Sequence, residues 1–243
     1  MTVPMPAPPA SLQLVLFSRA PVAGQTKTRL TPPLSPEQAR DVHVACLNDL
    51  LADGRAWAAA RTARTGVPVG LHLFITPPAS QPAFHRAGVH WPNDYALHNQ
   101  RGEELGVRME HAIRRARRDA AAPAGVLLVG TDLPLLGAAQ WDAAADALAA
   151  ADVVYGPTPD GGYYLVGMRC DPAGLFSISG WGGGTVLEQS LAAVRAAGLR
   201  PALIEALPDA DTAAHLREVL AHPRAAALAE RAGLRLIRDL LGR

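Results

Sequence analysis

Hydrophobic positions along the chain form short runs of strand length, which alternate with longer segments in which apolar residues recur at helical spacing. The runs at 12–18, 69–75 and 126–129 are mostly apolar, as is typical of strands buried on both faces of a parallel sheet. The stretch 77–92 has neither pattern and is predicted to be irregular. The pattern further predicts helices at 35–51, 101–118, 137–150, 185–197 and 211–241, and strands at 153–156, 163–167 and 201–207.

Two signatures mark where helices begin. Ser35 is followed by Pro36 and Gln38, which combines an N-cap residue, a proline at the first helical position and a capping-box glutamine. Thr185 and Glu188 have the spacing of a second capping box. Both signatures place a helix directly after a polar or glycine-rich loop.

The alternation of strands and helices determines the expected fold. It favours a mostly parallel sheet with helices on both faces. We therefore predict an α/β protein in which one Rossmann-like, three-layer α/β/α domain with a mostly parallel mixed sheet spans 12–243. The proline-rich segment 1–11 is predicted to be a disordered arm, and it has neither the basic nor the apolar region of a signal peptide.

Composition narrows the class of protein. A net charge of +1 gives no electrostatic case for binding nucleic acid or an anionic membrane, and no apolar run approaches the length of a membrane span. Cys46 and Cys170 are the only cysteines and lack metal-ligand spacing, which favours a reducing compartment. We expect a cytoplasmic protein whose partners are small molecules, and the sequence leaves its oligomeric state open.

The loop after the first strand, RAPVAGQTKTRL, concentrates positive charge where α/β folds bind ligands. It contains Arg19, Arg29 and Lys27, the only lysine in the chain, and Gly24 allows close approach of the backbone to an anion. These groups predict a phosphate cradle in which Lys27 is a compact point charge. The alternative is a basic surface loop. Gln25 and Thr26 separate the glycine from the lysine, which excludes a Walker A motif, and the single glycine excludes a dinucleotide fingerprint.

Three aspartates are candidate metal ligands. Asp132 ends the third strand, where one carboxylate with a helper can hold a divalent cation against a phosphate. Its alternative role is in a turn or as an N-cap before a proline. Asp211 and Asp209 lie where the last strand gives way to a helix, so a metal ligand and an N-cap remain alternatives for each.

Two glycine-rich loops complete the candidate chemistry. Asp160-Gly161 between two strands predicts a hairpin turn. Gly162 extends the flexible run and two tyrosines, Tyr163 and Tyr164, follow it, and such a glycine-rich turn also lets a sugar or phosphate lie against the backbone. GWGGGT at 180–185 precedes a helix and suits an anion site at its N-terminus. The alternatives are a mobile flap with Trp181 as an aromatic platform for a sugar or acceptor, and a flexible loop with a core tryptophan.

Several stretches together resemble one known family. RAPVAGQTKTRL, EELGVRM, GTDLPLL, GPTPDGGYYLVG, LFSISGWGGGTVLEQSL and DADT are similar to bacterial GT-A-like proteins of the nucleotide-diphospho-sugar transferase superfamily, often described as arsenosugar-biosynthesis or radical-SAM-associated transferases. The resemblance extends more distantly to phospholactate and molybdopterin nucleotidyltransferases. Arg19 stands where the family usually has a lysine, and His215 replaces an acidic residue that usually follows the DADT segment.

The resemblance implies a GT-A-type domain with Mg²⁺ or Mn²⁺ as cofactor. It places the nucleotide phosphates on the first loop and a divalent metal on Asp132, with Asp211 at the position of a second ligand. It implies catalytic roles for Asp132, Asp160 and Lys27; nucleotide contacts for Arg19, Gly24, Lys27, Arg29, Gly106 and Arg108; sugar or acceptor contacts for Gly161, Gly162, Tyr163 and Trp181; and metal ligands at Asp132 and Asp211.

The resemblance implies a metal-dependent glycosyltransferase that moves a sugar from a nucleotide-sugar donor to a small-molecule acceptor. The first alternative is a nucleotidyltransferase, which would move a nucleotide from a nucleoside triphosphate to a phosphorylated small molecule and release pyrophosphate. The second alternative is a nucleotide-binding module without catalysis. The sequence does not separate the first two, because a cationic loop and a strand-end aspartate serve either reaction.

Overall fold

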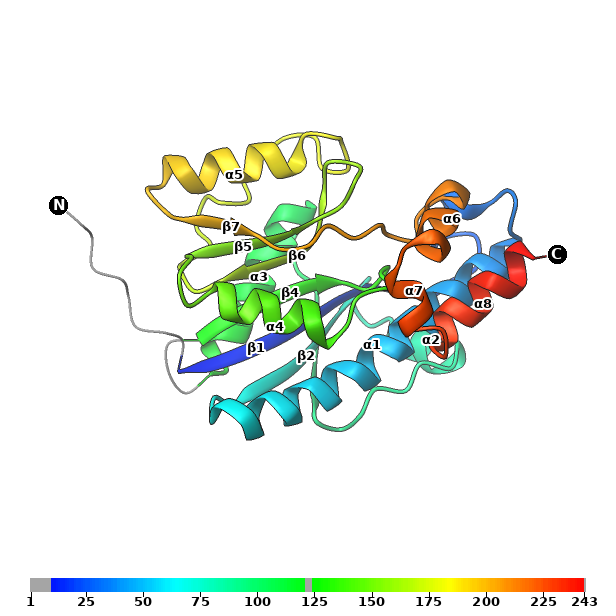
Figure 1. The fold of residues 1–243 in the computed structure, drawn as a ribbon, viewed down its shortest axis with the longest axis horizontal. Coiled ribbons are helices and arrows are strands. Elements are labelled where there is room, and N and C mark those ends of the chain that lie inside the picture. Colours follow the sequence, from blue (N-terminus) through cyan, green and yellow to red (C-terminus); the bar gives the residue numbers. More distant parts are fainter. Residues whose placement is uncertain (1–9, 121–123, 243) are drawn as a thin grey trace.

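A single mixed sheet organises the molecule, which a computed structural model describes for residues 10–120 and 124–242 (Figure 1). Its seven strands lie in the order β3-β2-β1-β4-β6-β5-β7. Neighbouring strands are parallel except where β6 runs antiparallel to β4 and β5. The strands are β1 (Ser11–Arg19), β2 (Val69–Thr76), β3 (Tyr95–Asn99), β4 (Ala124–Gly130), β5 (Val153–Pro157), β6 (Tyr163–Met168) and β7 (Pro201–Leu203).

Helices cover both faces of this sheet, which confirms the predicted three-layer α/β/α architecture. Helices α1 and α4 pack on one face, α3 and α5 pack on the other, and α8 lies along α1 beyond the sheet (Figure 1). The helical segments are η1 (Thr28–Leu30, a 3₁₀ turn), α1 (Pro36–Thr65), α2 (Gln81–Arg86), α3 (Leu105–Arg118), α4 (Ala138–Ala147), α5 (Val186–Ala196), α6 (Ala213–Ala221), α7 (Arg224–Ala227) and α8 (Ala232–Leu241).

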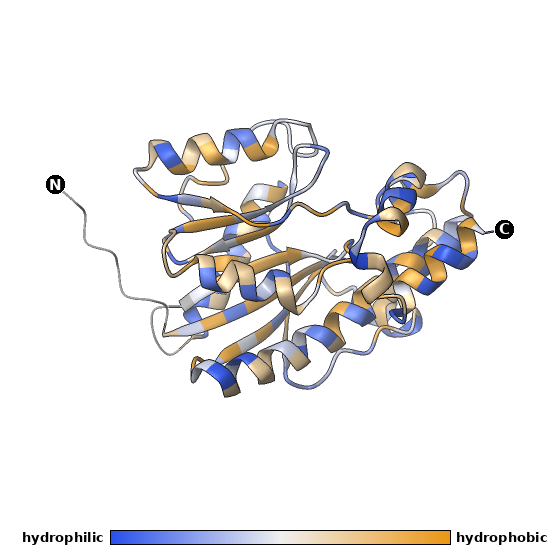
Figure 2. Cartoon of the chain, in the orientation of Figure 1, coloured by the Kyte–Doolittle hydropathy of each residue, from blue (hydrophilic) through white to orange (hydrophobic). Residues whose placement is uncertain are grey.

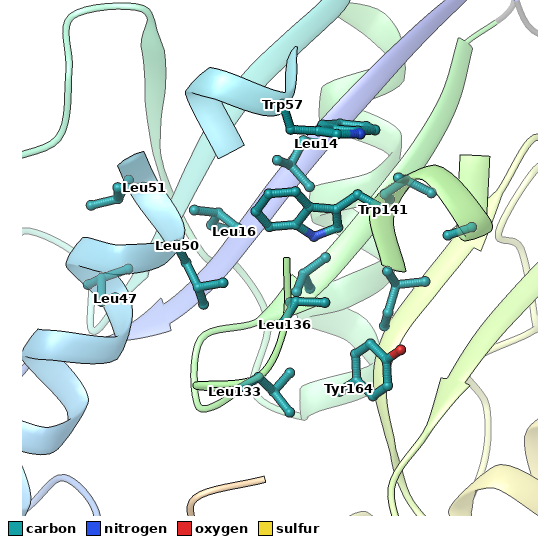
Figure 3. Packing of buried hydrophobic residues seen from close by; sticks show 14 of the residues in the cluster. Leu14, Leu16, Leu47, Leu50, Leu51, Trp57, Leu133, Leu136, Trp141 and Tyr164 are labelled. Atoms are coloured by element: carbon teal, nitrogen blue, oxygen red, sulfur yellow. The ribbon is translucent and has the colours of Figure 1, made fainter. Parts of the chain in front are cut away.

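The larger core lies between the sheet and the layer formed by α1 and α4. Leu14 and Leu16 of β1 meet Leu50 and Trp57 of α1, and Trp141 of α4 closes the space between them (Figure 3). The two indole rings are 5.6 Å apart and tilted by 54°. Hydrophobic colour follows the strands, whereas the helices alternate between hydrophobic and hydrophilic faces (Figure 2). Burial of these apolar faces supplies the main driving force for folding.

Truncation of Trp141 should lower the stability of the fold strongly. Trp141 is fully buried, so Trp141→Ala leaves a cavity and is expected to lower the free energy of unfolding by about 3–5 kcal/mol. Urea denaturation followed by circular dichroism measures the loss. Leu203→Ala is the matched control, because this side chain is half exposed and its truncation should cost less than about 1 kcal/mol. Equal losses in the two variants would contradict the packing described for α4.

Most predicted elements are confirmed, and the exceptions have local causes. Ser35 forms the predicted capping box with Gln38, and α1 then continues past 51 to Thr65, through an alanine-rich segment that the hydrophobic pattern did not mark. The second capping box is wrong: the Thr185 side chain makes no cap hydrogen bond and instead accepts one from Gln189 Nε2 at 2.9 Å.

Short elements account for the remaining differences. β3 and α2 fall in segments for which no element was predicted, and β7 ends at Leu203 instead of reaching 207. Five residues at a sheet edge carry too little alternation to be recognised without their pairing partner. Of the predicted disordered arm, residues 1–9 lie outside the described residues, and Ser11 already belongs to β1.

Candidate functional site

The candidate site lies where the topology opens the sheet. From β1, the chain order runs through β2 to β3 on one side, while β4 and the later strands lie on the other side. Loops that leave the carboxyl ends of β1 and β4 therefore diverge, which is where open α/β sheets bind ligands. A pocket of about 480 Å³ occupies this place. Its polar lining includes Arg19, Gln25, Thr26, Lys27, Arg29, His43, Gln100, Arg108, Thr131, Asp132 and Asp211.

The loop after β1 is held in shape by Thr26. Its hydroxyl donates to the Ala20 carbonyl at 2.6 Å and accepts from the Val22 N–H at 3.3 Å, so the loop closes on itself. Gly24 is exposed at the bend with φ of 76°, a left-handed conformation that suits glycine. Gly24 does not line the pocket; the next five residues do. The loop thus directs the side chains of 25–29 toward the site.

Lys27 is buried, and its ammonium faces two carboxylates. The side chain is 2% exposed, and Nζ lies 3.1 Å from Asp132 Oδ2 and 3.6 Å from Asp211 Oδ1. Nζ also donates to the Ala210 carbonyl at 2.8 Å. The backbone of Lys27 is left-handed, with φ of 58°, which is uncommon for a residue with a side chain and is held here by these contacts. The ammonium of Lys27 is therefore a counter-ion that joins the end of β4 to the loop before α6.

Asp132 sits at the carboxyl end of β4 with its carboxylate 43% exposed to the pocket. His43 of α1 donates from Nδ1 to Asp132 Oδ1 at 3.0 Å, while its Nε2 lies 3.0 Å from the Arg19 carbonyl. Burial alone would raise the pKa of Asp132, but the charge of Lys27 and the hydrogen bond from His43 outweigh it and hold that pKa well below its ordinary value. The carboxylate is thus a fixed negative charge at neutral pH.

Asp211 is not a helix cap. The cap of α6 is Thr212, whose hydroxyl accepts from the His215 N–H at 3.2 Å. The Asp211 carboxylate instead accepts from Arg29 Nη1 at 2.7 Å and faces Lys27. Both Asp211 and Asp132 therefore converge on one cation, which is the arrangement expected of carboxylates that can share a metal ion.

Two arginines face the pocket without a carboxylate partner. Among the residues that the structure describes, neither Arg19 nor Arg108 forms an ion pair, and both line the pocket wall. Burial, followed by the nearby charge of Arg19, lowers the pKa of Arg108. Two adjacent and uncompensated guanidinium groups create a positive potential that favours an anionic ligand.

A second pocket of about 250 Å³ adjoins the first. The two pockets share Leu105, Met109, Gly130, Asp132, Tyr163 and Tyr164, so Asp132 lies at their junction. The second pocket adds Thr158, Asp160, Gly162, Trp181 and Asp209 to its lining.

The hairpin between β5 and β6 forms one wall of the second pocket. Asp160 accepts from the Thr158 hydroxyl at 2.5 Å and from the Gly162 N–H at 3.2 Å, so the predicted turn is present. Gly161 is absent from the lining; a side chain there would collide with the backbone of Gly184. The hairpin is therefore packed against the glycine-rich loop 180–185.

Trp181 supplies the aromatic part of the second pocket. Its ring stacks on Phe176, with centroids 6.5 Å apart, and meets Tyr163 edge-on at 6.4 Å. Gly106 is not part of either pocket lining. A side chain at this position would collide with Phe176 and Trp181. Gly106 thus serves the packing of α3 against the loop that carries the tryptophan.

Several site residues were not predicted. His43 lies on the buried face of α1, where the apolar pattern conceals a polar residue that faces the site. Gln100 follows β3 and donates from Nε2 to the carbonyls of Ser18 and Phe74, at 2.9 and 3.1 Å, which ties the ends of β1 and β2 together. A polar side chain on an otherwise buried helix face is the one signal that would have identified His43.

Comparison with known proteins supports the same fold and gives a family. The model of the family DUF2064, described as "Uncharacterized protein conserved in bacteria", matches residues 59–183, just over half of the chain. No match was found among curated proteins.

Solved structures share the architecture of the chain. A candidate nucleotide-diphospho-sugar transferase from Desulfovibrio desulfuricans G20 is 25% identical, with a TM-score of 0.78 and coverage of 95% of each chain. Rv0371c from Mycobacterium tuberculosis H37Rv is 17% identical, with a TM-score of 0.51 and coverage of 90% of this chain and 100% of its own. Its homologue from Mycobacterium sp. strain JC1 is 16% identical, with a TM-score of 0.53 and coverage of 88% and 96%. The arsenosugar and radical-SAM descriptions find no support in these comparisons.

Proposed function

We propose that this chain, which belongs to the DUF2064 family, is a metal-dependent transferase that moves a sugar from a nucleotide-sugar donor to a small-molecule acceptor. The observation that carries the proposal is the pair of adjoining pockets at the carboxyl edge of the sheet, with Asp132 at their junction. The likeness to the Desulfovibrio candidate nucleotide-diphospho-sugar transferase supports the same class of reaction.

The first pocket suits the donor. Its volume of about 480 Å³ falls within the range of small-molecule and cofactor sites. Arg19 and Arg108 offer unpaired guanidinium groups to a diphosphate. Arg29, which is 64% exposed and paired with Asp211, adds a further positive charge at the rim. Arginine binds phosphate oxygens through two parallel hydrogen bonds, so these side chains fix the orientation of the donor as well as its charge.

The carboxylates of Asp132 and Asp211 fit a hard divalent cation. Mg²⁺ and Mn²⁺ prefer oxygen ligands and usually take one or two carboxylates together with substrate phosphates. In the structure both carboxylates already converge on a single positive group, the ammonium of Lys27. When bound, Mg²⁺ or Mn²⁺ would stabilise the negative charge of the departing nucleoside diphosphate. His43 holds the Asp132 carboxylate in place through Nδ1.

The second pocket suits an acceptor that combines an apolar ring or chain with a hydroxyl group. Leu133, Tyr163 and Trp181 provide contact surface, and besides the shared Asp132 the lining contains two acidic groups, Asp160 and Asp209. A general base must accept the acceptor proton as the new bond forms. We assign this role to Asp209 ahead of Asp160. Asp160 accepts two hydrogen bonds within the turn between β5 and β6, whereas Asp209 accepts one, from His215 Nδ1 at 2.6 Å.

The two candidate bases can be separated by mutation. Burial, and after it the charge of Asp211, raises the pKa of Asp209, although Lys27 and His215 act in the opposite direction. A raised pKa brings a carboxylate closer to the value that proton transfer needs. Asp209→Asn is therefore expected to lower kcat by about 100-fold or more, with donor affinity unchanged. Asp160→Asn is the matched control, and a larger loss of kcat in that variant would transfer the role to Asp160.

Nucleotidyl transfer is the second candidate function. Three arginines around the first pocket, Arg19, Arg29 and Arg108, also suit the larger charge of a triphosphate. The reaction would then release pyrophosphate from a nucleoside triphosphate. We keep the expectation of a reducing, cytoplasmic setting for either reaction. Separately, none of the helices among the described residues is both long and apolar enough to cross a membrane.

A thermal-shift panel tests the proposed function. The melting temperature is measured with nucleoside triphosphates, nucleoside diphosphates and nucleotide-sugars, each with and without Mg²⁺ or Mn²⁺. A ligand of the folded state raises its stability by mass action, by about 2.7 kcal/mol at a concentration 100 times Kd. We expect metal-dependent stabilisation by a nucleotide-sugar. Stabilisation by triphosphates alone would favour nucleotidyl transfer, and no stabilisation by any of these ligands would contradict both functions.

A further inference from the structure

A separate cluster of ligating side chains lies outside both pockets, at the edge of the sheet next to the C-terminal end of α3. It consists of His72 from β2, His98 from β3 and Asp119, which caps α3. One ligand atom from each residue lies within 4.8 Å of the other two. His72 Nδ1 is 3.1 Å from His98 Nε2, and His98 Nε2 is 3.9 Å from Asp119 Oδ2.

The fold itself brings the two imidazoles together. The parallel pairing of β2 and β3 sets His98 opposite Phe74, and residues 72 and 74 point to the same face of the sheet because side chains alternate along a strand. The imidazole rings stack with centroids 5.3 Å apart and planes inclined by 28°. The positions of both rings are thus determined by strand register and not by mobile loops.

A polar neighbour orients the inner imidazole. His72 is 4% exposed, and its Nε2 lies 2.8 Å from Gln13 Oε1 on β1. The amide oxygen can only accept, so Nε2 carries the proton and the lone pair of Nδ1 faces His98. Metal-binding histidines show this arrangement, in which a second-shell acceptor fixes the tautomer and the ring orientation. Burial and then the neighbouring His98 lower the pKa of His72 to about 4, so its ring is neutral at pH 7.

We propose that His72 Nδ1, His98 Nε2 and the Asp119 carboxylate bind one divalent transition-metal ion of the zinc class. In a tetrahedral site with metal–nitrogen distances of about 2.0–2.1 Å, two ligand nitrogens lie about 3.3 Å apart. The imidazole nitrogens are already at 3.1 Å. The Asp119 carboxylate lies 3.9 Å from His98 Nε2, and the three ligand atoms lie within 4.8 Å of one another, so this carboxylate has to move toward both imidazoles to complete the site. Two imidazoles and one carboxylate select Zn²⁺, Co²⁺ or Ni²⁺ over Mg²⁺.

Some charges around the cluster favour a bound cation and others oppose it. The C-terminal end of α3 carries a partial negative charge that favours a cation at Asp119. Against this, Arg115 forms an ion pair with Asp119, with Nε 3.2 Å from Oδ2, and Arg101 and Arg118 line a neighbouring pocket together with His98. Arg115 is therefore a direct competitor of the metal for one carboxylate oxygen. Its removal should strengthen metal binding, an effect that a purely structural hydrogen-bond cluster would not produce.

Cobalt binding tests the proposal directly. Protein purified without a polyhistidine tag is titrated with Co²⁺, and the visible absorption of the ion and the affinity for Zn²⁺ in competition are measured. We expect one equivalent bound in a four- or five-coordinate nitrogen-containing environment. His98→Gln should weaken binding by more than about 100-fold, because loss of an outer-shell partner alone costs about 10–100-fold. Arg115→Gln should tighten binding roughly tenfold by removing one positive charge beside the ion.

Matched variants locate the ion. Arg114→Gln removes an exposed arginine of the same helix that pairs with Glu110 and Asp171, so its metal affinity should equal that of the wild type. Asp132→Asn changes the carboxyl-edge site alone and should retain the Co²⁺ spectrum. Absence of Co²⁺ binding, unchanged binding in His98→Gln, or loss of the ion in Asp132→Asn would each overturn the proposal. The result is independent of the proposed transferase activity, because neither donor nor acceptor enters the experiment.

Discussion

Replacement of Asp132 by asparagine is expected to lower sugar transfer by about 1,000-fold while the protein remains folded. The substitution keeps the shape of the side chain and removes one negative charge from the junction of the two pockets. A divalent metal then loses a carboxylate ligand, and the charge of the departing nucleoside diphosphate is no longer stabilised. Product formation from the donor identified by the thermal-shift panel, measured as kcat/KM, gives the size of the loss.

Two controls make this result specific to Asp132. Asp171→Asn removes an exposed carboxylate outside both pockets and should leave kcat/KM unchanged. Circular dichroism should show that Asp132→Asn retains its secondary structure. Turnover at the wild-type rate in the folded Asp132→Asn variant would contradict the metal-dependent mechanism.

The same variant has a defined pH dependence of stability. Because the folded-state pKa of Asp132 is depressed, its ionised form stabilises the fold above the unfolded-state pKa of about 3.9. The stability difference between wild type and Asp132→Asn should therefore be present at pH 7. It should shrink as the pH falls below about 4 and through the folded-state pKa. Urea denaturation at several pH values measures this difference, and a difference that grows in acid would contradict the assignment.

Loss of Lys27 is expected to have the second-largest effect, on both stability and ligand binding. Lys27→Ala leaves Asp132 and Asp211 facing each other without their shared cation. Removal of one partner of a fully buried ion pair lowers the free energy of unfolding by about 3–5 kcal/mol. The side chains of Asp132 and Asp211 are 43% and 27% exposed, so water screens part of the unpaired charge and a loss of roughly 1–3 kcal/mol is expected here. Donor affinity should fall as well, because two unneutralised carboxylates repel the phosphates of the donor.

Divalent cations provide a test of what the lysine does. If Lys27 serves as the counter-ion of the two aspartates, Mg²⁺ or Mn²⁺ should raise the melting temperature of Lys27→Ala more than that of the wild type, since the ion replaces the missing charge. Lys27→Met keeps the buried alkyl chain and should show the same preference, which separates charge from packing. Equal stability of Lys27→Ala and wild type, with equal response to metal, would contradict this role.

Of all the predictions made from the sequence, the one for the loop after β1 is changed most by the structure. From the sequence, Lys27 is a free point charge for a phosphate; in the structure its ammonium binds Asp132, Asp211 and the Ala210 carbonyl. The groups that remain available to an anion are Arg19 and Arg108, which come from β1 and α3. The contacts that redirect Lys27 join residues 105 to 184 positions apart in the chain, so no local pattern announces them.

Local patterns in the sequence determined the fold and the region of the site. Alternating strand and helix periodicities gave a mostly parallel three-layer domain, since burial of an apolar face constrains each element by itself. The topological rule for α/β sheets then identified the loops after β1 and β4. The positions of Asp132 and the hairpin at Asp160 follow from these two arguments, because both depend on residues that are neighbours in the chain.

Only the tertiary structure decided how the charged groups are paired. It placed His43 behind Asp132, released Asp211 from a capping role, and left Gly106 in a packing contact outside both pockets. It also joined His72 to His98, which a short edge strand had concealed. The physical reason is that electrostatic and hydrogen-bond partners are chosen by distance in space, and distances between separate elements are set by the packing of the whole core.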